Sequence, residues 1–298
     1  MLWPTAAYQL LWMLSVQRRN TLIPSKEKMM LKGKTALVTG SVIGIGNATA
    51  RALAAEGCNI MMCGLGTPAE IEASRAAIEL EYNVTVKFFE ADLAQRNQTE
   101  ALALASMEEF GSVDILVNNA VIRYYDDIVD FDPKNWDHAL AVNVTAPFDL
   151  TRMALPGMKK RGWGRIVNIS SIMGLAARSG RADYITSKTA IIGLTRSTAA
   201  ETLRDPNITC NAIAPGSVLS DFIKVRIQKM ADERQTSFDE MAKRYKKDIG
   251  QIADFIEPAQ IADAIVYLCR DESRHISGTV LPVDGGIAAT WVENPEEI

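Results

Sequence analysis

Short runs of apolar, often β-branched residues alternate with longer amphipathic stretches along most of this chain. Seven of these runs have the length and composition of buried strands: residues 35–40, 59–64, 86–92, 114–120, 164–171, 208–216 and 279–286. Amphipathic segments with helical spacing lie between them, for example residues 47–57, 68–82 and 98–110. Near-continuous apolar strands separated by helices indicate a parallel sheet covered on both faces. Because crossovers between parallel strands are right-handed, the pattern predicts an α/β fold with a doubly wound parallel sheet, the Rossmann fold.

The alternation continues without a repeat or a low-complexity linker through residues 31–290, which we expect to form a single domain. One segment departs from it: residues 217–257 are charged and helical in character and follow Pro215 and Gly216 at the end of a strand. A connection of that length is typically a lid or a binding loop. Since ligands of open α/β sheets bind beyond the carboxyl ends of the strands, we expect a helical substrate lid at about residues 217–257.

The two ends of the chain fall outside this domain. Residues 1–30 begin apolar, become basic and close with Met29 and Met30. We expect this extension to be either a mis-assigned start, with the protein beginning at Met29 or Met30, or a targeting segment of the transit-peptide kind. Residues 291–298 form a C-terminal tail.

The composition excludes several classes of protein. Apolar residues make up 48% and charged residues 23%, the balance of a soluble globular protein. The net charge of −4 comes from interspersed charges, so we expect no nucleic-acid partner. Beyond the N-terminus no apolar run reaches the roughly 18–20 residues of a membrane span, which favours a cytoplasmic protein without a membrane partner.

Cysteine and histidine usage excludes metal chemistry. The four cysteines match no metal or redox spacing and are expected to be buried thiols: Cys58, Cys63, Cys210 and Cys269. His138 and His275 are the two histidines of the chain. This is too few for a zinc-dependent alcohol dehydrogenase, and neither has the context of a Ser-His-Asp hydrolase.

A glycine-rich turn, TGSVIGIG, occupies residues 39–46 between the first strand and the first helix. Its glycines let the backbone turn tightly and approach a pyrophosphate, while the helix N-terminus offers free N–H groups and a positive dipole. The position between strand and helix is the context that this mechanism requires. The turn predicts a dinucleotide site that involves Gly40, Ser41, Gly44, Ile45 and Gly46.

Two later strand ends supply further candidates for the dinucleotide site. Asp92, with Leu93 beside it, is placed at the end of the third strand, where its carboxylate can accept a hydrogen bond from an adenine amino group. A helix cap would look similar. Asn119 and Ala120 follow the fourth strand, where small and amide side chains can line the nicotinamide ribose pocket.

The end of the second strand separates NAD from NADP. A 2′-phosphate requires an Arg or Lys partner, but residues 63–66 read Cys-Gly-Leu-Gly and the turn has Ile43 where a base could stand. The acid that commonly binds the 2′-hydroxyl of NAD is missing as well. NAD is therefore favoured by exclusion, and Leu65 is expected to be part of the cofactor site.

Tyr184 and Lys188 open an apolar helix with i,i+4 spacing, which puts both side chains on one helix face. A phenol has an ordinary pKa of about 10, and a neighbouring ammonium favours the phenolate, so the pair can exchange a proton near neutrality. Ser171 lies at the carboxyl end of the preceding strand, placed to hydrogen-bond a substrate carbonyl oxygen.

The turn TGSVIGIG, the run Asn118-Asn119-Ala120, Ser171, the Tyr184/Lys188 pair and Pro215-Gly216 occur in the order typical of the short-chain dehydrogenase/reductase family. The chain resembles that family from residue 31 to about residue 290. The resemblance implies that Asn143 completes a catalytic tetrad with Ser171, Tyr184 and Lys188 and holds a water in a proton relay. It also implies that Lys188 binds the nicotinamide ribose, that Tyr184 lies against the cofactor, and that the nicotinamide is flanked by Pro215, Gly216 and Val218. One position departs from the family: Val121 stands where NNAG has its glycine, which adds bulk behind the nicotinamide.

Within the family, the segments GLGTPAEIEASRAAIE, ALPGMKKRGWGRIVNISS and LPVDGG resemble the bacterial D-3-hydroxybutyrate dehydrogenase branch. This resemblance implies NAD as cofactor and a homotetramer. The residues that bind the substrate carboxylate in that branch are replaced here by Arg123, Met173, Arg181, Ser217 and Arg226. Three arginines can hold an anion, bidentately if well placed; the alternative is that they are solvated surface side chains.

These observations favour an NAD-dependent oxidoreductase that interconverts a secondary alcohol and a ketone, on a hydroxy acid or a related anionic small molecule. Two alternatives stay open. One is a 3-oxoacyl thioester reductase, which would use NADPH, and the other is a dinucleotide-binding sensor without catalysis. Fold alone does not separate them.

Overall fold

The computed structural model describes residues 30–248 and 254–289. The predictions for the tail at residues 291–298 and for the extension at residues 1–30, of which Met30 alone is described, lie outside those residues.

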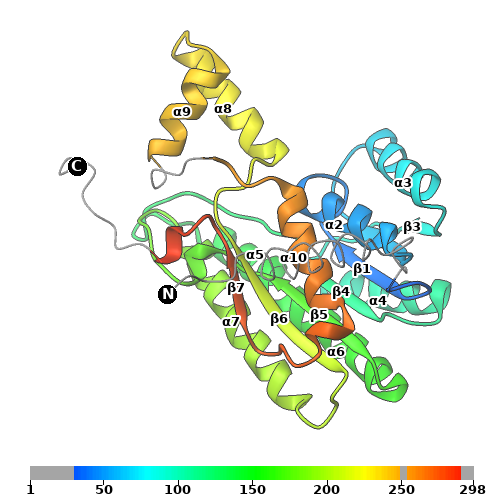
Figure 1. Ribbon diagram of the computed structural model, residues 1–298. Helices are drawn as coiled ribbons and strands as arrows, with labels where there is room; N and C mark the ends of the chain where they lie inside the picture. Colours follow the sequence, from blue (N-terminus) through cyan, green and yellow to red (C-terminus); the bar gives the residue numbers. More distant parts are fainter. Residues whose placement is uncertain (1–29, 249–253, 290–298) are drawn as a thin grey trace, which may run out of the picture. The chain divides into compact units, whose positions relative to one another are not determined.

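Seven parallel strands form one sheet in the order β3-β2-β1-β4-β5-β6-β7 (Figure 1). Their bounds are β1 Thr35–Thr39, β2 Asn59–Cys63, β3 Val86–Phe88, β4 Ile115–Asn118, β5 Gly164–Ile169, β6 Ile208–Pro215 and β7 Val280–Val283. The order reverses between β1 and β4, where the crossovers turn to opposite sides and leave a crevice at the carboxyl ends of the strands. The predicted doubly wound parallel sheet is confirmed.

Helices cover both faces of the sheet because alternate strand residues point to opposite sides. One face is covered by α2 (Gly44–Ala55), α3 (Pro68–Tyr82) and α10 (Pro258–Cys269), and the other by α4 (Arg96–Phe110), α6 (Ala146–Arg161) and α7 (Ala182–Glu201). Val38 and Val117 belong to the core beneath α2 and α10, while their neighbours Leu37 and Leu116 belong to the core beneath α4 and α6. This double burial explains why the strands read as continuous apolar runs.

Each strand ends before the predicted run does, and the difference is largest at β3, which stops at Phe88 instead of residue 92. The chain turns there: the Gln95 N–H donates to the Asp92 carbonyl at 2.9 Å, and the Asp92 carboxylate accepts from the Ala94 N–H at 2.9 Å. Asp92 therefore lies in the loop after β3, not at the end of the strand as predicted.

Two helices, α8 (Asp221–Glu233) and α9 (Phe238–Asp248), lie in the segment predicted as a lid. They pack on each other through a small core of their own, in which Ile227, Ala231 and Met241 are fully buried. The role of this segment as a lid remains a prediction.

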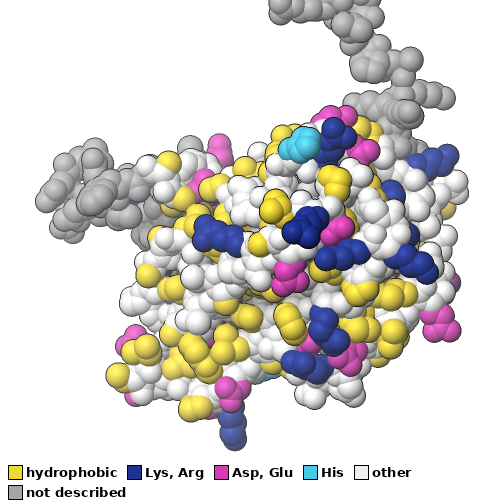
Figure 2. Space-filling view, turned by 90° about the horizontal axis from the view of Figure 1, so that it is seen from below, with side chains coloured by type: hydrophobic (Ala, Val, Ile, Leu, Met, Phe, Trp, Pro, Cys, Tyr) yellow, Lys and Arg dark blue, Asp and Glu magenta, His cyan; other side chains and the backbone are white. Residues whose placement is uncertain are grey.

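Surface features agree with the interspersed charges of the sequence. On the face drawn in Figure 2, Lys and Arg side chains lie among acidic and apolar ones. In the part of the chain that the structure describes, no helix is long and apolar enough to cross a bilayer.

Candidate active site

A cleft of about 1680 Å³ runs along the carboxyl ends of the strands, lined by the loops after β1 to β6 and by α8. It brings together most of the predicted site residues. Those that line it are Gly40, Gly44, Ile45, Leu65, Asp92, Leu93, Asn119, Ala120, Arg123, Ser171, Met173, Arg181, Tyr184, Lys188, Pro215, Gly216, Ser217, Val218 and Arg226. Ser41, Gly46 and Asn143 lie behind its wall.

The glycine-rich turn is shaped for close backbone contact. A Cβ on Gly46 would lie 2.0 Å from the Gly40 carbonyl oxygen, so a side chain cannot be placed there. Gly44 has φ +60°, a left-handed conformation that favours glycine. Ile43 precedes α2 without a side-chain cap, so the first N–H groups of this helix stay available for an anion. The turn therefore fits a dinucleotide pyrophosphate.

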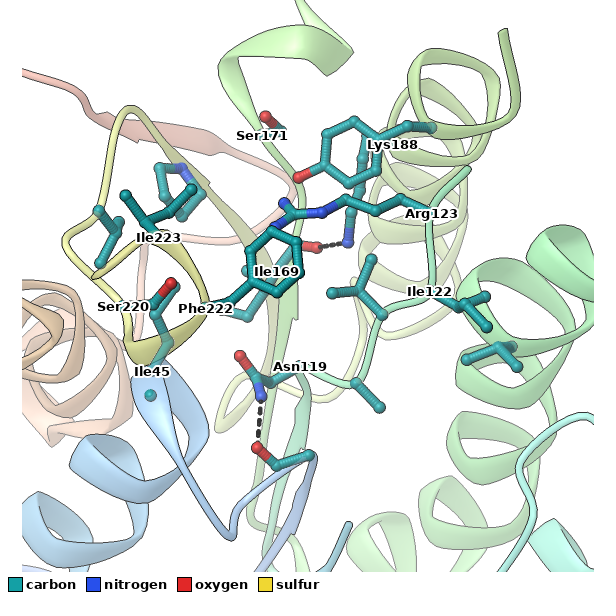
Figure 3. Close-up of a pocket in the computed structure, with 18 of the residues that line it drawn as sticks. Ile45, Asn119, Ile122, Arg123, Ile169, Ser171, Lys188, Ser220, Phe222 and Ile223 are labelled. Carbon is teal, nitrogen blue, oxygen red and sulfur yellow. Dashed lines mark hydrogen bonds between the residues drawn. The ribbon is translucent and has the colours of Figure 1, made fainter. Parts of the chain in front are cut away.

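Neighbouring strands hold this turn in place. The Asn119 side-chain amide donates to the Thr39 and Gly40 carbonyls at 2.9 and 3.1 Å, and Figure 3 draws one of these two bonds. The Ser41 hydroxyl and N–H both bond to the backbone of Cys63 in β2. Asn119 and Ser41 thus shape the turn with their side chains.

The end of the cleft that is predicted to hold the adenosine is formed by the ends of β2 and β3. Glu90 and Gln98 line it beside the predicted Leu65 and Asp92. The Asp92 N–H donates to the Gln98 side chain at 2.9 Å. Glu90 and Gln98 were not predicted, because they lie in irregular chain and at the start of a helix, where no motif marks them.

Lys188 and Tyr184 face the cleft from the first turns of α7. The Lys188 side chain is 3% exposed, and its ammonium donates to the Ile169 carbonyl at 2.7 Å and lies 5.6 Å from the centre of the Tyr184 ring (Figure 3). Burial first, and then the positive charge of Arg123, lower the pKa of Lys188 to about 7. Ser171 lies at the end of β5, where its hydroxyl accepts from the Met173 N–H at 3.1 Å.

Asn143 supports the site from a π-helical turn, Ala141–Thr145. Its side chain donates to the Ile122 carbonyl at 2.8 Å and to the Ser187 hydroxyl at 3.1 Å, and accepts from the Ile122 N–H at 2.9 Å. It therefore ties the loop after β4 to α7. The water relay predicted for Asn143 stays a prediction.

Comparison with known proteins gives the same family. The family model for short chain dehydrogenases matches residues 34–231. A D-beta-hydroxybutyrate dehydrogenase of Cupriavidus necator is 37% identical over 264 residues, 88% of this chain and 99% of that protein. Its counterpart in Rhizobium meliloti is 36% identical and covers 86% and 99%. The crystal structure of L-sorbose reductase from Gluconobacter frateurii, complexed with NADPH and L-sorbose, matches with a TM-score of 0.84 at 27% identity, over 89% of this chain and all of that one.

The chain belongs to the short-chain dehydrogenase family. It is thus an oxidoreductase of this family, and the predicted resemblance to the D-3-hydroxybutyrate dehydrogenase branch is confirmed.

In this short-chain dehydrogenase, the side of the cleft that is predicted to hold the substrate is rich in arginine. Arg123, from the loop after β4, extends toward Phe222 of α8, with 4.5 Å from its guanidinium carbon to the ring centre (Figure 3). Arg181 stacks on Tyr125 at 4.0 Å and on Tyr184 at 4.8 Å. Arg226 of α8 donates to the Tyr125 hydroxyl at 3.0 Å. The three arginines meet in the cleft, and Arg181 is only 8% exposed, so a description as solvated surface side chains does not hold for it.

The remaining substrate candidates, and Val121 beside the predicted nicotinamide site, are uncharged. Met173 and Ser217 line the cleft without charge, and Val121 is 43% exposed on its wall. Val121 thus lines the cleft itself. Tyr125 and Arg178 also line the cleft and were not predicted, because no family motif includes them.

The low pKa of Lys188 predicts a pH-dependent stability for the ligand-free protein. Its pKa is about 7 in the folded state and 10.5 as the ordinary value, so the unfolded chain binds more protons between these limits and stability rises with pH. Relative to a Lys188→Met variant, the wild type should gain about 2 kcal/mol in free energy of unfolding from pH 7 to pH 9, at roughly 1.4 kcal/mol per unit. Urea unfolding of both proteins at the two pH values measures this. A matched variant, Lys229→Met on the exposed side of α8, should follow the wild type, and a pH-independent difference for Lys188→Met would contradict the prediction.

Proposed function

We propose that this short-chain dehydrogenase interconverts a secondary alcohol and a ketone on an anionic small molecule, with NAD as its cofactor. The observation that supports it best is the convergence of Tyr184, Lys188 and Ser171 with three arginines in the cleft that begins at the pyrophosphate turn. A hydroxy acid or keto acid has the matching groups: an oxygen for Tyr184 and Ser171, and an anion for the arginines.

The residues of the chain divide the chemistry among them. A bound nicotinamide would exchange a hydride with the substrate carbon that carries the reacting oxygen. Tyr184 passes its phenolic proton to the substrate oxygen in reduction and takes it back in oxidation. Ser171 donates a hydrogen bond to the same oxygen, and the Lys188 ammonium places positive charge behind the phenol. The buried surroundings of Lys188 strengthen that interaction, because charges act over a longer range where water is excluded.

The adenosine end of the cleft supports NAD over NADP. Of the described residues that line this end, none is Lys or Arg, and two are carboxylates, Glu90 and Asp92. A 2′-phosphate carries nearly two negative charges and would lie there without a cationic partner. The NADPH of the sorbose reductase complex belongs to a relative at 27% identity and does not bear on the residues at this end of the cleft.

The homotetramer also remains a proposal, which rests on the family resemblance.

Steady-state rates with NADH and NADPH test the proposal on a panel of ketones that includes acetoacetate, keto-sugar acids and neutral cyclic ketones. We expect an anionic ketone to be reduced with a kcat/KM at least about tenfold higher for NADH than for NADPH, because one unpaired phosphate costs on the order of 1.4 kcal/mol or more. A Leu65→Arg variant should narrow that ratio by placing a cation at the end of β2. Reduction of neutral ketones alone would contradict the anionic substrate, and a preference for NADPH would favour a 3-oxoacyl thioester reductase. NADH binding without turnover of any ketone would favour a sensor.

A further inference from the structure

Four arginines line the cleft, and the three that gather around Tyr125 lack acidic partners. Arg123, Arg181 and Arg226 come from three separate segments, and within the described residues none lies within 4.0 Å of a carboxylate. Other arginines of the fold are paired, as Arg161 is with Asp114 at 3.0 Å. These three guanidinium groups thus line the cleft without a carboxylate at ion-pair distance.

Arg181 shows this most clearly, because it is also buried. Its side chain lies between the rings of Tyr125 and Tyr184, and its Nε has no hydrogen-bond partner. Removing a guanidinium from water without pairing it is costly, and aromatic faces return only part of that cost. A ligand acid group would complete its hydrogen bonds.

Tyr125 marks where the three charges converge. Burial raises the pKa of Tyr125, but the charges of Arg123, Arg181 and Arg226 outweigh burial and leave this pKa below its ordinary value of 10. Arg226 donates to the phenol oxygen, so that oxygen already occupies a position that favours negative charge. None of the nearby acids pairs with these arginines: Asp126 and Asp127 are exposed, Asp221 lies 3.9 Å from Lys224, and the buried Asp183 accepts from the Tyr124 N–H.

Three guanidinium groups exceed the need of one carboxylate, which a single arginine can bind bidentately. The tyrosine rings divide the cluster: Arg123 and Arg181 flank Tyr184, while Arg181 and Arg226 flank Tyr125. We propose that the substrate is a dianion, a hydroxy or keto dicarboxylate, with one acid group beside Tyr184 and the other beside Tyr125. This rests on the proposed function and narrows its substrate class. A phosphate monoester of a hydroxy ketone shares the chemistry of two negative charges on one small molecule.

Binding to the NADH complex tests this without knowledge of the substrate. Isothermal titration compares malonate, succinate and glutarate with the monocarboxylates of equal carbon number, propionate, butyrate and valerate, and with inorganic phosphate. We expect the best dicarboxylate to bind at least about tenfold more tightly than its monocarboxylate, since a second charge-assisted contact is gained. Arg226→Gln should weaken dicarboxylate binding more than monocarboxylate binding and so bring that affinity ratio to within about twofold. Lys229→Gln removes the same charge from the same helix outside the cleft, and should keep the wild-type ratio.

The outcomes separate this inference from the proposed function. Phosphate binding tighter than that of any dicarboxylate, and weakened by Arg226→Gln, would support the dianion and identify a phosphate monoester as its source. Equal affinity for mono- and dicarboxylates in the wild type, together with NADH-dependent reduction of a monoanionic ketone, would overturn the dianion alone. Absence of binding by every anion to the NADH complex would overturn both.

Discussion

A Tyr184→Phe variant should lose turnover by a factor on the order of 10³ while it still binds NADH, because general acid–base catalysis contributes roughly 10²–10⁴. In the proposed function the Tyr184 phenol, on the same face of α7 as Lys188, hands its proton to the substrate oxygen. Phenylalanine keeps the ring that lies against Arg181 at 4.8 Å, so the arginine cluster should stay in place. Initial rates with NADH and the best ketone of the panel give kcat, and quenching of protein fluorescence gives the NADH dissociation constant.

Tyr267→Phe is the matched control for this prediction. Tyr267 lies on α10, is 48% exposed and does not line the cleft, so the same loss of a hydroxyl should leave kcat within about twofold. If Tyr184→Phe retained wild-type kcat, another group would have to supply the proton, and the assignment of Tyr184 would be wrong. If it lost NADH binding as well, the effect would be on the cofactor site and would not show proton transfer.

The parts of the molecule that the sequence predicts well are those that one short segment determines. The central strands are apolar runs because both faces of the sheet are covered there, so pattern alone locates them, whereas the partly exposed edge strands β3 and β7 are shorter than their predicted runs. The turn at residues 39–46 is readable because only glycine fits at Gly46, where a Cβ would meet the Gly40 carbonyl. The Tyr184/Lys188 pair is readable because i,i+4 spacing fixes one helix face.

The features that the sequence does not predict arise from contacts between distant segments. Tyr125 becomes part of the site only because Arg181, the residue before α7, and Arg226 of α8 meet its ring and hydroxyl. No local pattern around residue 125 contains that information. Likewise, the side chain of Asn119 looks available for a ligand in the motif, yet the fold uses it to hold the glycine-rich turn.

The second large effect concerns stability, at the end of the sheet opposite the cleft. Arg165 lies at the start of β5 and is fully buried, with its guanidinium 4.5 Å from the Trp163 ring centre. It donates to the carbonyls of Cys269, Gly164 and Asn207 and lies 3.3 Å from the Asp271 carboxylate. Arg165 thereby connects β5 to the end of α10 and to the segment that leads into β6.

Arg165→Met should lower the free energy of unfolding by roughly 2–4 kcal/mol, because methionine fills much of the volume but removes the side-chain donor of the Cys269 carbonyl and one of the two donors of the Asn207 carbonyl, which keeps the Gly164 N–H. The carbonyls belong to the backbone and remain after the substitution, so this is not the exchange of an ion pair for apolar packing that proteins often tolerate. Urea unfolding measures the change, with an unaltered m-value as the sign that the unfolded state is unaffected.

Arg204→Met, at an exposed position after α7, is the matched control and should stay within about 0.5 kcal/mol of the wild type. A loss below about 1 kcal/mol for Arg165→Met would mean that water or a shifted side chain replaces the guanidinium at those carbonyls. Arg165 lies at the opposite end of β5 from Ile169, whose carbonyl accepts from Lys188. A destabilised but folded variant should therefore keep the geometry of the cleft and its kcat.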